Sequence, residues 1–250
     1  MKIKQLGFVS GVALATLVTA SAAQAALVVV PPGLNPGDQY RLVFVTSGTR
    51  NATSSNINDY NTFVTNQVTG SALATQLTTA GFNLGTITWK AIGSTSATSA
   101  KVNTGTDGSQ PDVPIYLING NKVANNNADL WDGSILTTIE LTPAETAPPN
   151  FRVFSGTNSD GTSAGAANAL GGSDSFAINV GRNDYFNSSW IFAATRRNDD
   201  PLPFYGMSSV LTVPTPAVTV PEPSSPLGLI TLGGLMLGSA VRLTGGGSDT

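Results

Sequence analysis

Two uncharged apolar segments, one at each end of the chain, restrict what this sequence can fold into. The first occupies residues 6–20, follows the basic residues Lys2 and Lys4, and leads to Ala23 and Ala25. A basic start, an apolar run and small residues of this kind are typical of a secretory signal peptide. We therefore expect signal peptidase to cleave after Ala25, so that residues 1–25 are absent from the mature fold.

The second apolar segment, residues 226–241, follows a proline-rich stretch and precedes Arg242. A membrane-spanning helix needs about 20 apolar residues, and this segment is both shorter than that and rich in glycine, which weakens a helix. We expect residues 226–250 to form a hydrophobic helix and a short tail that anchor the chain to the membrane for a time. Residues 214–225 would be an extended spacer, because prolines cannot donate to a sheet.

The residues Val220, Pro221, Glu222 and Pro223, followed by this apolar run and Arg242, resemble the PEP-CTERM sorting signal of Gram-negative bacteria that carry an exosortase. The resemblance implies that a processing enzyme of the exosortase type removes the tail near Pro-Glu-Pro and passes the protein to the cell surface or matrix. Members of that class end in several basic residues, which favour a cytoplasmic end, whereas here Arg242 stands alone. The alternative is a proline-rich linker before a plain anchor.

The composition excludes several kinds of chemistry. The chain has no histidine and no cysteine, so Ser-His-Asp and Cys-His catalysis, histidine-ligated zinc and disulfides are all excluded. A carboxylate-dependent hydrolase stays open as an alternative, with Glu140, Glu145 and Glu222 as the glutamates outside the first segment. The net charge of −3 and the lack of a Lys/Arg cluster argue against nucleic-acid binding.

Residues 26–213 predict a single β-rich domain of the α+β class, because short apolar runs alternate with Gly, Pro and Asn. A helix is expected to begin at Ser54 or Ser55 and to place Ile57, Tyr60 and Val64 on one face. The alternation of apolar and polar residues in 38–46 predicts a half-buried strand. The other strands are expected at 86–92, 113–118, 151–154, 189–194 and 208–213.

Four segments, 40–47, 89–95, 130–133 and 154–161, resemble a family of secreted bacterial domains similar to C-type-lectin-like folds. The resemblance implies a small twisted sheet, one or two helices and long loops. Lectin-like domains normally contain disulfides, which this chain cannot form.

Oxygen-rich stretches at 107–112, 125–132 and 158–160 suggest calcium as the one cofactor to consider, since calcium binds oxygen ligands from flexible loops. Gln110, Pro111 and Asp112 resemble the calcium and galactose tripeptide of sugar-binding C-type lectins, and Trp131 with Asp132 resembles the Trp-Asn-Asp strand that completes their site. Asn158 and Asp160 join this candidate set for sugar or calcium contact. The alternative is that these residues form solvated turns and that Trp131, like Trp89, belongs to the core.

The leading hypothesis is an exported, non-enzymatic surface or extracellular-matrix protein, with the membrane as a partner through residues 226–241 and extracellular polysaccharide as a second candidate partner. The first alternative is a calcium-assisted carbohydrate-binding module. The second alternative is the carboxylate-dependent hydrolase.

Overall fold

The computed structural model describes residues 26–215 of the 250-residue chain. The expected signal peptide with Ala23 and Ala25 lies outside the described residues, as do most of the spacer and the segment 226–250. The expected sorting motif also lies outside them, namely Val220, Pro221, Glu222, Pro223 and Arg242. Within residues 26–215, no helix is both long and apolar enough to cross a membrane.

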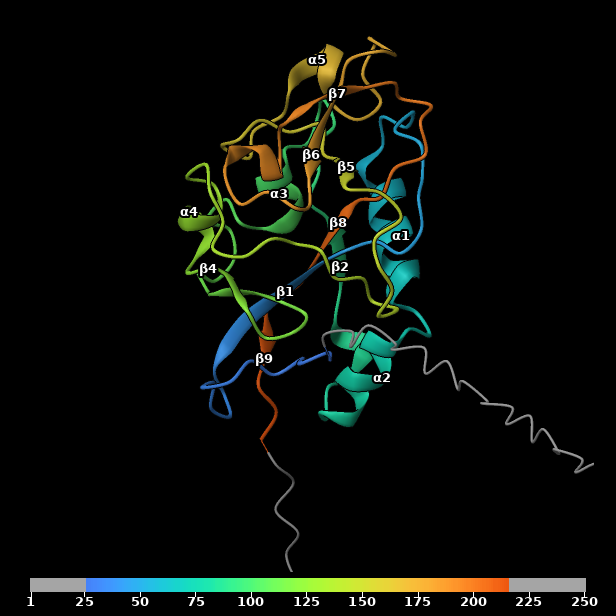
Figure 1. Ribbon diagram of the computed structural model, residues 1–250. Coiled ribbons are helices and arrows are strands. Elements are labelled where there is room, and N and C mark those ends of the chain that lie inside the picture. The colour runs from blue at the N-terminus through green and yellow to red at the C-terminus, as the bar shows by residue number, and fades with distance from the viewer. Residues whose placement is uncertain (1–25, 216–250) are drawn as a thin grey trace, which may run out of the picture. The chain divides into compact units, whose positions relative to one another are not determined.

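The main sheet is built around the strand β1 (Gln39–Val45), which comes early in the described chain (Figure 1). The strand order is β2 (Trp89–Ala91), β8 (Tyr205–Ser208), β1, β3 (Ile115–Leu117) and β4 (Lys122–Ala124), and β9 (Leu211–Thr212) pairs with the start of β1. β1 and β3 are parallel, whereas the other pairs are antiparallel. The domain is therefore closed by pairing between its first and its last strands.

The prediction that residues 38–46 form a half-buried strand is wrong in one respect, since β1 is buried on both faces. Tyr40, Leu42 and Phe44 enter one apolar cluster, while Val43 and Val45 enter a second cluster on the opposite face. The alternation that the sequence shows is therefore between two cores. It does not separate core from solvent, because β1 lies in the middle of the sheet with other elements packed on both sides.

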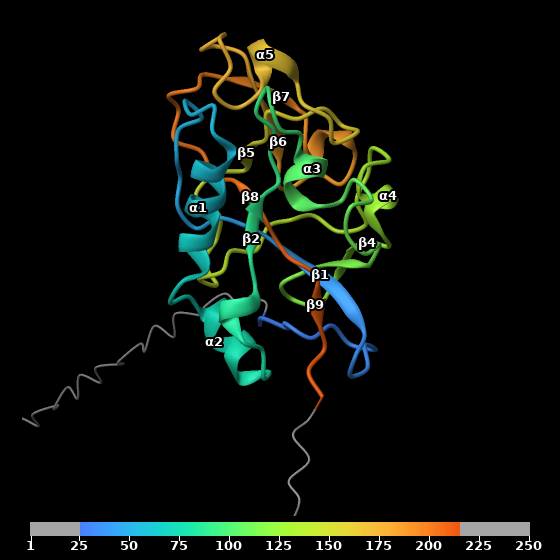
Figure 2. The ribbon, with the colours of Figure 1, turned by 180° about the vertical axis from the view of Figure 1, so that it is seen from behind.

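The helices α1 (Ile57–Val68) and α2 (Ala72–Thr79) lie on the same side of β1 in Figures 1 and 2. The predicted helix is confirmed as α1, and Tyr60 and Val64 on its expected face are fully buried. Its cap was predicted wrongly. The side chain of Asn56 accepts a hydrogen bond from the Asn58 N–H at 3.1 Å, so Asn56, rather than Ser54 or Ser55, caps the helix.

A second, three-stranded antiparallel sheet consists of β5 (Arg152–Phe154), β6 (Ile178–Arg182) and β7 (Ala194–Arg196). The strand expected at 189–194 is wrong, because a short 3-10 helix, η2 (Ser188–Trp190), occupies its start and β7 begins only at Ala194. Asn187 caps this turn through its side chain, and Trp190 is fully buried. The tight turn thus inserts Trp190 and Ile191 into the core and leaves Phe192 exposed.

The remaining elements are short and separated by long loops: η1 (Leu84–Thr86), α3 (Ala100–Thr104), α4 (Asn127–Leu130) and α5 (Gly165–Asn168). The strands predicted at 86–92, 113–118 and 151–154 contain the shorter strands β2, β3 and β5. The strand predicted at 208–213 is divided between the end of β8 and β9, which pairs Thr212 with Gln39. The fold is of the α+β class.

Candidate functional site

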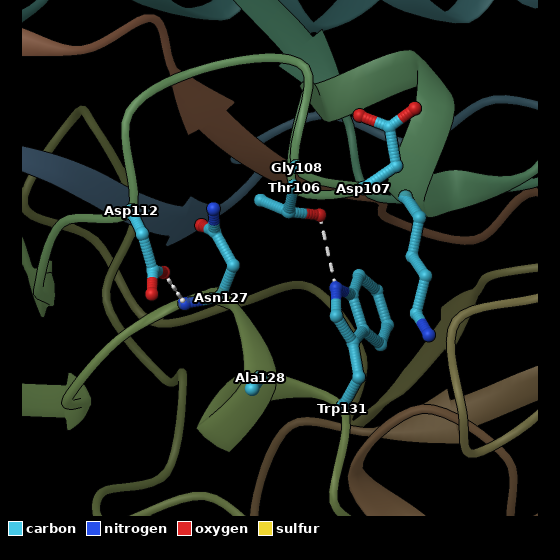
Figure 3. A pocket seen from close by; sticks show the side chains of 8 residues that line it. Thr106, Asp107, Gly108, Asp112, Asn127, Ala128 and Trp131 are labelled. Carbon is cyan, nitrogen blue, oxygen red and sulfur yellow. Dashed lines mark hydrogen bonds between the residues drawn. The ribbon is translucent and has the colours of Figure 1, made fainter.

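A cleft of about 500 Å³ lies between the loop 105–112 and the helix α4 (Figure 3). The loop begins where α3 ends at Gly105, whose φ of 68° is a left-handed conformation that favours glycine. It is tied to α4 by Asp112, whose Oδ1 accepts a hydrogen bond from the Asn127 N–H at 2.7 Å. The cleft is lined by Lys101, Thr106, Asp107, Gly108, Asp112, Asn127, Ala128 and Trp131.

Asn127 is the most unusual residue of the cleft. Its side chain lies between Asp112 and Thr106 in Figure 3, and the residue is only 6% exposed. Within the described part of the chain, neither its Oδ1 nor its Nδ2 has a hydrogen-bond partner. Buried amide groups are nearly always hydrogen-bonded, since an unpaired one costs about 1–3 kcal/mol. An unpaired amide in the wall of a cleft therefore points to a polar ligand.

Trp131 belongs to the core. It is 6% exposed, and its Nε1 donates a hydrogen bond to the Thr106 Oγ1 at 2.9 Å. Its ring centroid lies 5.8 Å from that of Trp190. At Gly161, a Cβ atom would approach the indole to 2.6 Å, so the backbone of that glycine packs closely on the ring. The expectation that Trp131 offers an open face to a sugar is not supported by this packing.

The cleft contains charges of both signs. Asp107 and Lys101 line it together with Asp112. Hydrogen bonds from the side chain and the backbone N–H of Ser109 lower the pKa of Asp107, so its carboxylate stays ionised. The cleft therefore offers carboxylate acceptors, an ammonium donor and an amide that can both donate and accept.

Three of the predicted oxygen-rich stretches contain the same local turn, an Asp-Gly-Ser/Thr sequence whose carboxylate binds the residue two positions later. Asp107 accepts from the Ser109 N–H, Asp132 from Ser134 and Asp160 from the Thr162 N–H, at 3.0 to 3.1 Å. The central glycines all have positive φ. These three aspartates shape their own loops, as the turn interpretation expects.

The structure separates most of the predicted contact residues. Asp112 and Trp131 line the cleft, whereas Gln110 lies on the other side of the loop, in a groove with Arg41. Asp132 and Asp160 are not among the lining residues, and the Asn158 side chain bonds to the Ser163 carbonyl oxygen. The Gln-Pro-Asp tripeptide therefore does not form one ligand set, because its two polar ends face different cavities.

Three residues that line the cleft were not among the predicted contact residues: Asn127, Thr106 and Lys101. The signal for Asn127 was its position in the oxygen-rich stretch 125–132, but nothing in the local sequence distinguishes it from Asn125 or Asn126. Asn126 is used as the cap of α4, accepting from the Asp129 N–H at 2.9 Å. Only the fold determines which of the neighbouring amides is left without a partner.

The described residues contain no group of three or more acidic side chains placed to hold a metal ion. Asp107, Asp112 and the Oδ1 of Asn127 are oxygen donors of the type that calcium binds. They are fewer than the six to eight oxygens that calcium takes, so bound water or ligand oxygens would have to supply the rest. The described residues of the cleft therefore contain no complete calcium site.

Of the glutamates considered for a hydrolase, Glu140 and Glu145 do not line the cleft, and Glu222 lies outside the described residues. Burial and the neighbouring charge of Asp184 raise the pKa of Glu140, which is the change that a general acid requires. However, Asp184 is already paired with Arg182, the Nε of which donates to its Oδ1 at 2.9 Å. A free second carboxylate, which both glycosidase mechanisms need, is not provided by this pair.

Exposed aromatic rings lie at the end of the β5–β6 ladder. Phe151 and Tyr185 are 44% and 40% exposed. The Arg182 guanidinium lies 4.3 Å from the centroid of the Phe151 ring and 4.4 Å from that of Tyr185, and it is held by Asp184. Cation–π contacts of this kind fix both rings in place. Phe151 and Tyr185 therefore present the open aromatic faces that Trp131 lacks.

Comparisons with protein-family models and with curated proteins find no match to this chain. The chemistry of the cleft beside the loop 105–112 is accordingly the basis for assigning a function.

Proposed function

We propose that the chain is an exported, non-enzymatic surface or extracellular-matrix protein whose folded domain binds carbohydrate in the cleft beside the loop 105–112. The observation that carries the proposal is the unpaired amide of Asn127. An amide offers two donors and one acceptor, which is the pattern needed for neighbouring hydroxyl groups of a sugar. The carboxylates of Asp107 and Asp112 can accept from further hydroxyls, and Lys101 can donate.

The cleft suits binding better than catalysis. Its volume of about 500 Å³ lies in the range of small-molecule sites. Hydrogen bonds lower the pKa of Asp107, so this carboxylate is a poor general acid, and the composition supplies no imidazole or thiol. A cleft that offers hydrogen-bond donors and acceptors, but no imidazole or thiol, is expected to hold its ligand unchanged.

The sequence supports export and surface sorting, through the signal peptide expected at 1–25 and the PEP-CTERM resemblance at Val220, Pro221, Glu222, Pro223 and Arg242. The small sheet, the two helices α1 and α2 and the long loops support a C-type-lectin-like assignment for the domain.

Binding is tested by applying the full chain to an array of neutral and acidic glycans. We expect signal on a limited set of glycans, and we expect Asp107→Asn to weaken it roughly tenfold, because a hydrogen bond to a charged group contributes about 1.5–3 kcal/mol. Asp132→Asn is the matched control, since Asp132 forms the same Asp-Gly-Ser turn but does not line the cleft. Equal loss in both variants, or an array without signal, would refute the proposal.

The role of calcium is tested by repeating the array with a chelator and then with calcium restored. Loss and recovery of the signal would assign calcium to the cleft, with Asp107, Asp112 and the Asn127 Oδ1 as its protein ligands. A signal that survives chelation would assign the contacts to direct hydrogen bonds.

Export and sorting are tested by cell fractionation and mass spectrometry of the mature termini. We expect a new N-terminus at Ala26 and a C-terminus near Pro223 in surface or medium fractions. An intact chain in the cytosol would contradict both parts of this prediction. Removal of the N-terminal segment alone would support a plain anchor over exosortase processing.

A further inference from the structure

A buried arginine lies on the other side of the loop 105–112 from the cleft. Arg41, on β1, is only 2% exposed. Its Nη1 donates to the carbonyl oxygens of Thr104 at 2.8 Å and of Ser208 at 3.1 Å, and its Nη2 donates to that of Gly105 at 3.3 Å. Its Nε has no partner among the described residues. Every group that holds this charge is therefore neutral.

No carboxylate compensates the charge of Arg41. None of the ion pairs within the described part of the chain includes it, and burial lowers the pKa of Arg41. A buried charge without a partner of opposite sign costs several kcal/mol, which is why buried charges are nearly always paired. An anion bound next to Arg41 would relieve this cost.

A groove of about 340 Å³ gives such an anion a place to bind. Arg41 lines it together with Lys90 of β2, and Ser109, Gln110 and Ser209 supply polar groups at its walls. None of its lining residues is acidic. Lys90 pairs with Met207 across β2 and β8, the strand that also contacts Arg41. The two positively charged side chains thus line one polar groove, whose walls also include residues of α3.

We propose that this groove is a second ligand site, which binds a carboxylate or sulfate group of an acidic sugar beside Lys90 and above the buried Arg41. Lys90 contacts the oxyanion directly, since it is partly exposed. Arg41 acts through its field, which is strong in a region shielded from water. The hydroxyls of Ser109 and Ser209 and the amide of Gln110 then bind the hydroxyl groups of the same sugar. This site does not depend on whether the cleft beside Asn127 binds a glycan.

The test is a titration of the full chain with sodium glucuronate, sodium sulfate and glucose, at constant ionic strength, followed by calorimetry. We expect saturable binding of glucuronate and none of glucose. Lys90→Gln should weaken glucuronate binding roughly tenfold or more, because it removes a hydrogen bond between charged groups. Lys122→Gln is the matched control, since Lys122 lies on the edge strand β4 over the Tyr116 ring and should leave binding unchanged.

Comparison with sulfate shows whether the oxyanion that the groove binds belongs to an acidic sugar or is a small free anion. Competition in which glucuronate binds at least tenfold more tightly than sulfate supports an acidic sugar as the ligand. Sulfate binding as tight as glucuronate binding would overturn the sugar assignment and leave a site for small free anions.

Two further outcomes would overturn the site itself. One is the absence of saturable binding by either anion, and the other is glucuronate binding that Lys90→Gln does not change. Asp107→Asn should have no effect on glucuronate binding, so a failure of the cleft and a failure of the groove can be told apart. Because Lys90 is on the surface of a short strand, its variant is expected to fold, which circular dichroism checks.

Discussion

Replacing Asn127 by leucine should stabilise the protein and abolish ligand binding at the cleft. The Oδ1 and Nδ2 of Asn127 are buried and have no hydrogen-bond partner among residues 26–215, so the amide destabilises the folded state when no ligand is bound. Leucine has the same number of side-chain heavy atoms, branched at the same carbon, and no polar atoms. The N–H of residue 127 would still donate to Asp112, so the link between α4 and the loop 105–112 is kept.

The magnitude follows from the cost of an unpaired buried polar group, about 1–3 kcal/mol. Some of this gain is lost to imperfect packing of the leucine, which costs up to about 1.5 kcal/mol for a swap of similar volume. We therefore expect the free energy of unfolding to rise by about 1–2 kcal/mol. For a domain of this size, each kcal/mol raises the melting temperature by roughly 2–4 °C.

Urea denaturation followed by tryptophan fluorescence measures this change, because Trp89, Trp131 and Trp190 are all buried in the fold. The matched control is Asn126→Leu. Asn126 has the same side chain but caps α4 through a hydrogen bond to the Asp129 N–H. Loss of this cap should lower the free energy of unfolding by about 1 kcal/mol, whereas Asn127→Leu should raise it.

A loss of 1 kcal/mol or more in Asn127→Leu would refute this reasoning. It would mean that the amide of Asn127 is already hydrogen-bonded in the free protein, for example to an ordered water. The argument for a ligand from the unpaired amide would then fail as well.

Three other changes test the geometry of the fold. Gly181→Ala should destabilise the protein by more than about 3 kcal/mol or prevent folding, because the new Cβ would lie 2.0 Å from the backbone oxygen of Trp190; thermal unfolding measures this. Phe204→Ala should lower the free energy of unfolding by about 3–5 kcal/mol, since this fully buried ring contacts three others, and a loss below 1 kcal/mol in urea denaturation would contradict it. Hydrogen bonds from Thr162 lower the pKa of Asp160 in the folded protein. The ionised Asp160 therefore stabilises the fold at pH values above its unfolded-state pKa of about 3.9, and this stabilisation is lost as the pH falls through the folded-state pKa. Thr162→Val should raise the pKa of Asp160, as carboxyl NMR titration would show.

Local pattern was sufficient for some elements. The spacing of Tyr60 and Val64 located α1 because helical periodicity is a property of the segment alone. The same reasoning located β1 but misjudged its surroundings, since alternation does not reveal whether the second face meets water or another layer. Residues 189–194 were misassigned because apolar β-formers in a short run do not distinguish a strand from a buried tight turn.

The candidate site was less accessible from the sequence. Gln110 and Asp112 are near neighbours and were expected to act together, but the direction of each side chain depends on the path of the loop. Asp112 instead meets the N–H of Asn127, fifteen residues further along the chain. Arg41 gave no signal at all, because its unpaired charge exists only when β1 is covered on both faces.

The sequence by itself determined which functional groups the protein can use: carboxylates, amides, hydroxyls and a few cations, with no imidazole and no thiol in the chain. It also set the turns, since each Asp-Gly-Ser/Thr unit forms its hydrogen bonds within three residues. Only the tertiary structure decided which buried polar groups were left without partners among the described residues, the Asn127 amide and the Arg41 Nε being two of them. The physical reason is that the desolvation of a side chain depends on everything packed around it, and those neighbours come from distant parts of the chain.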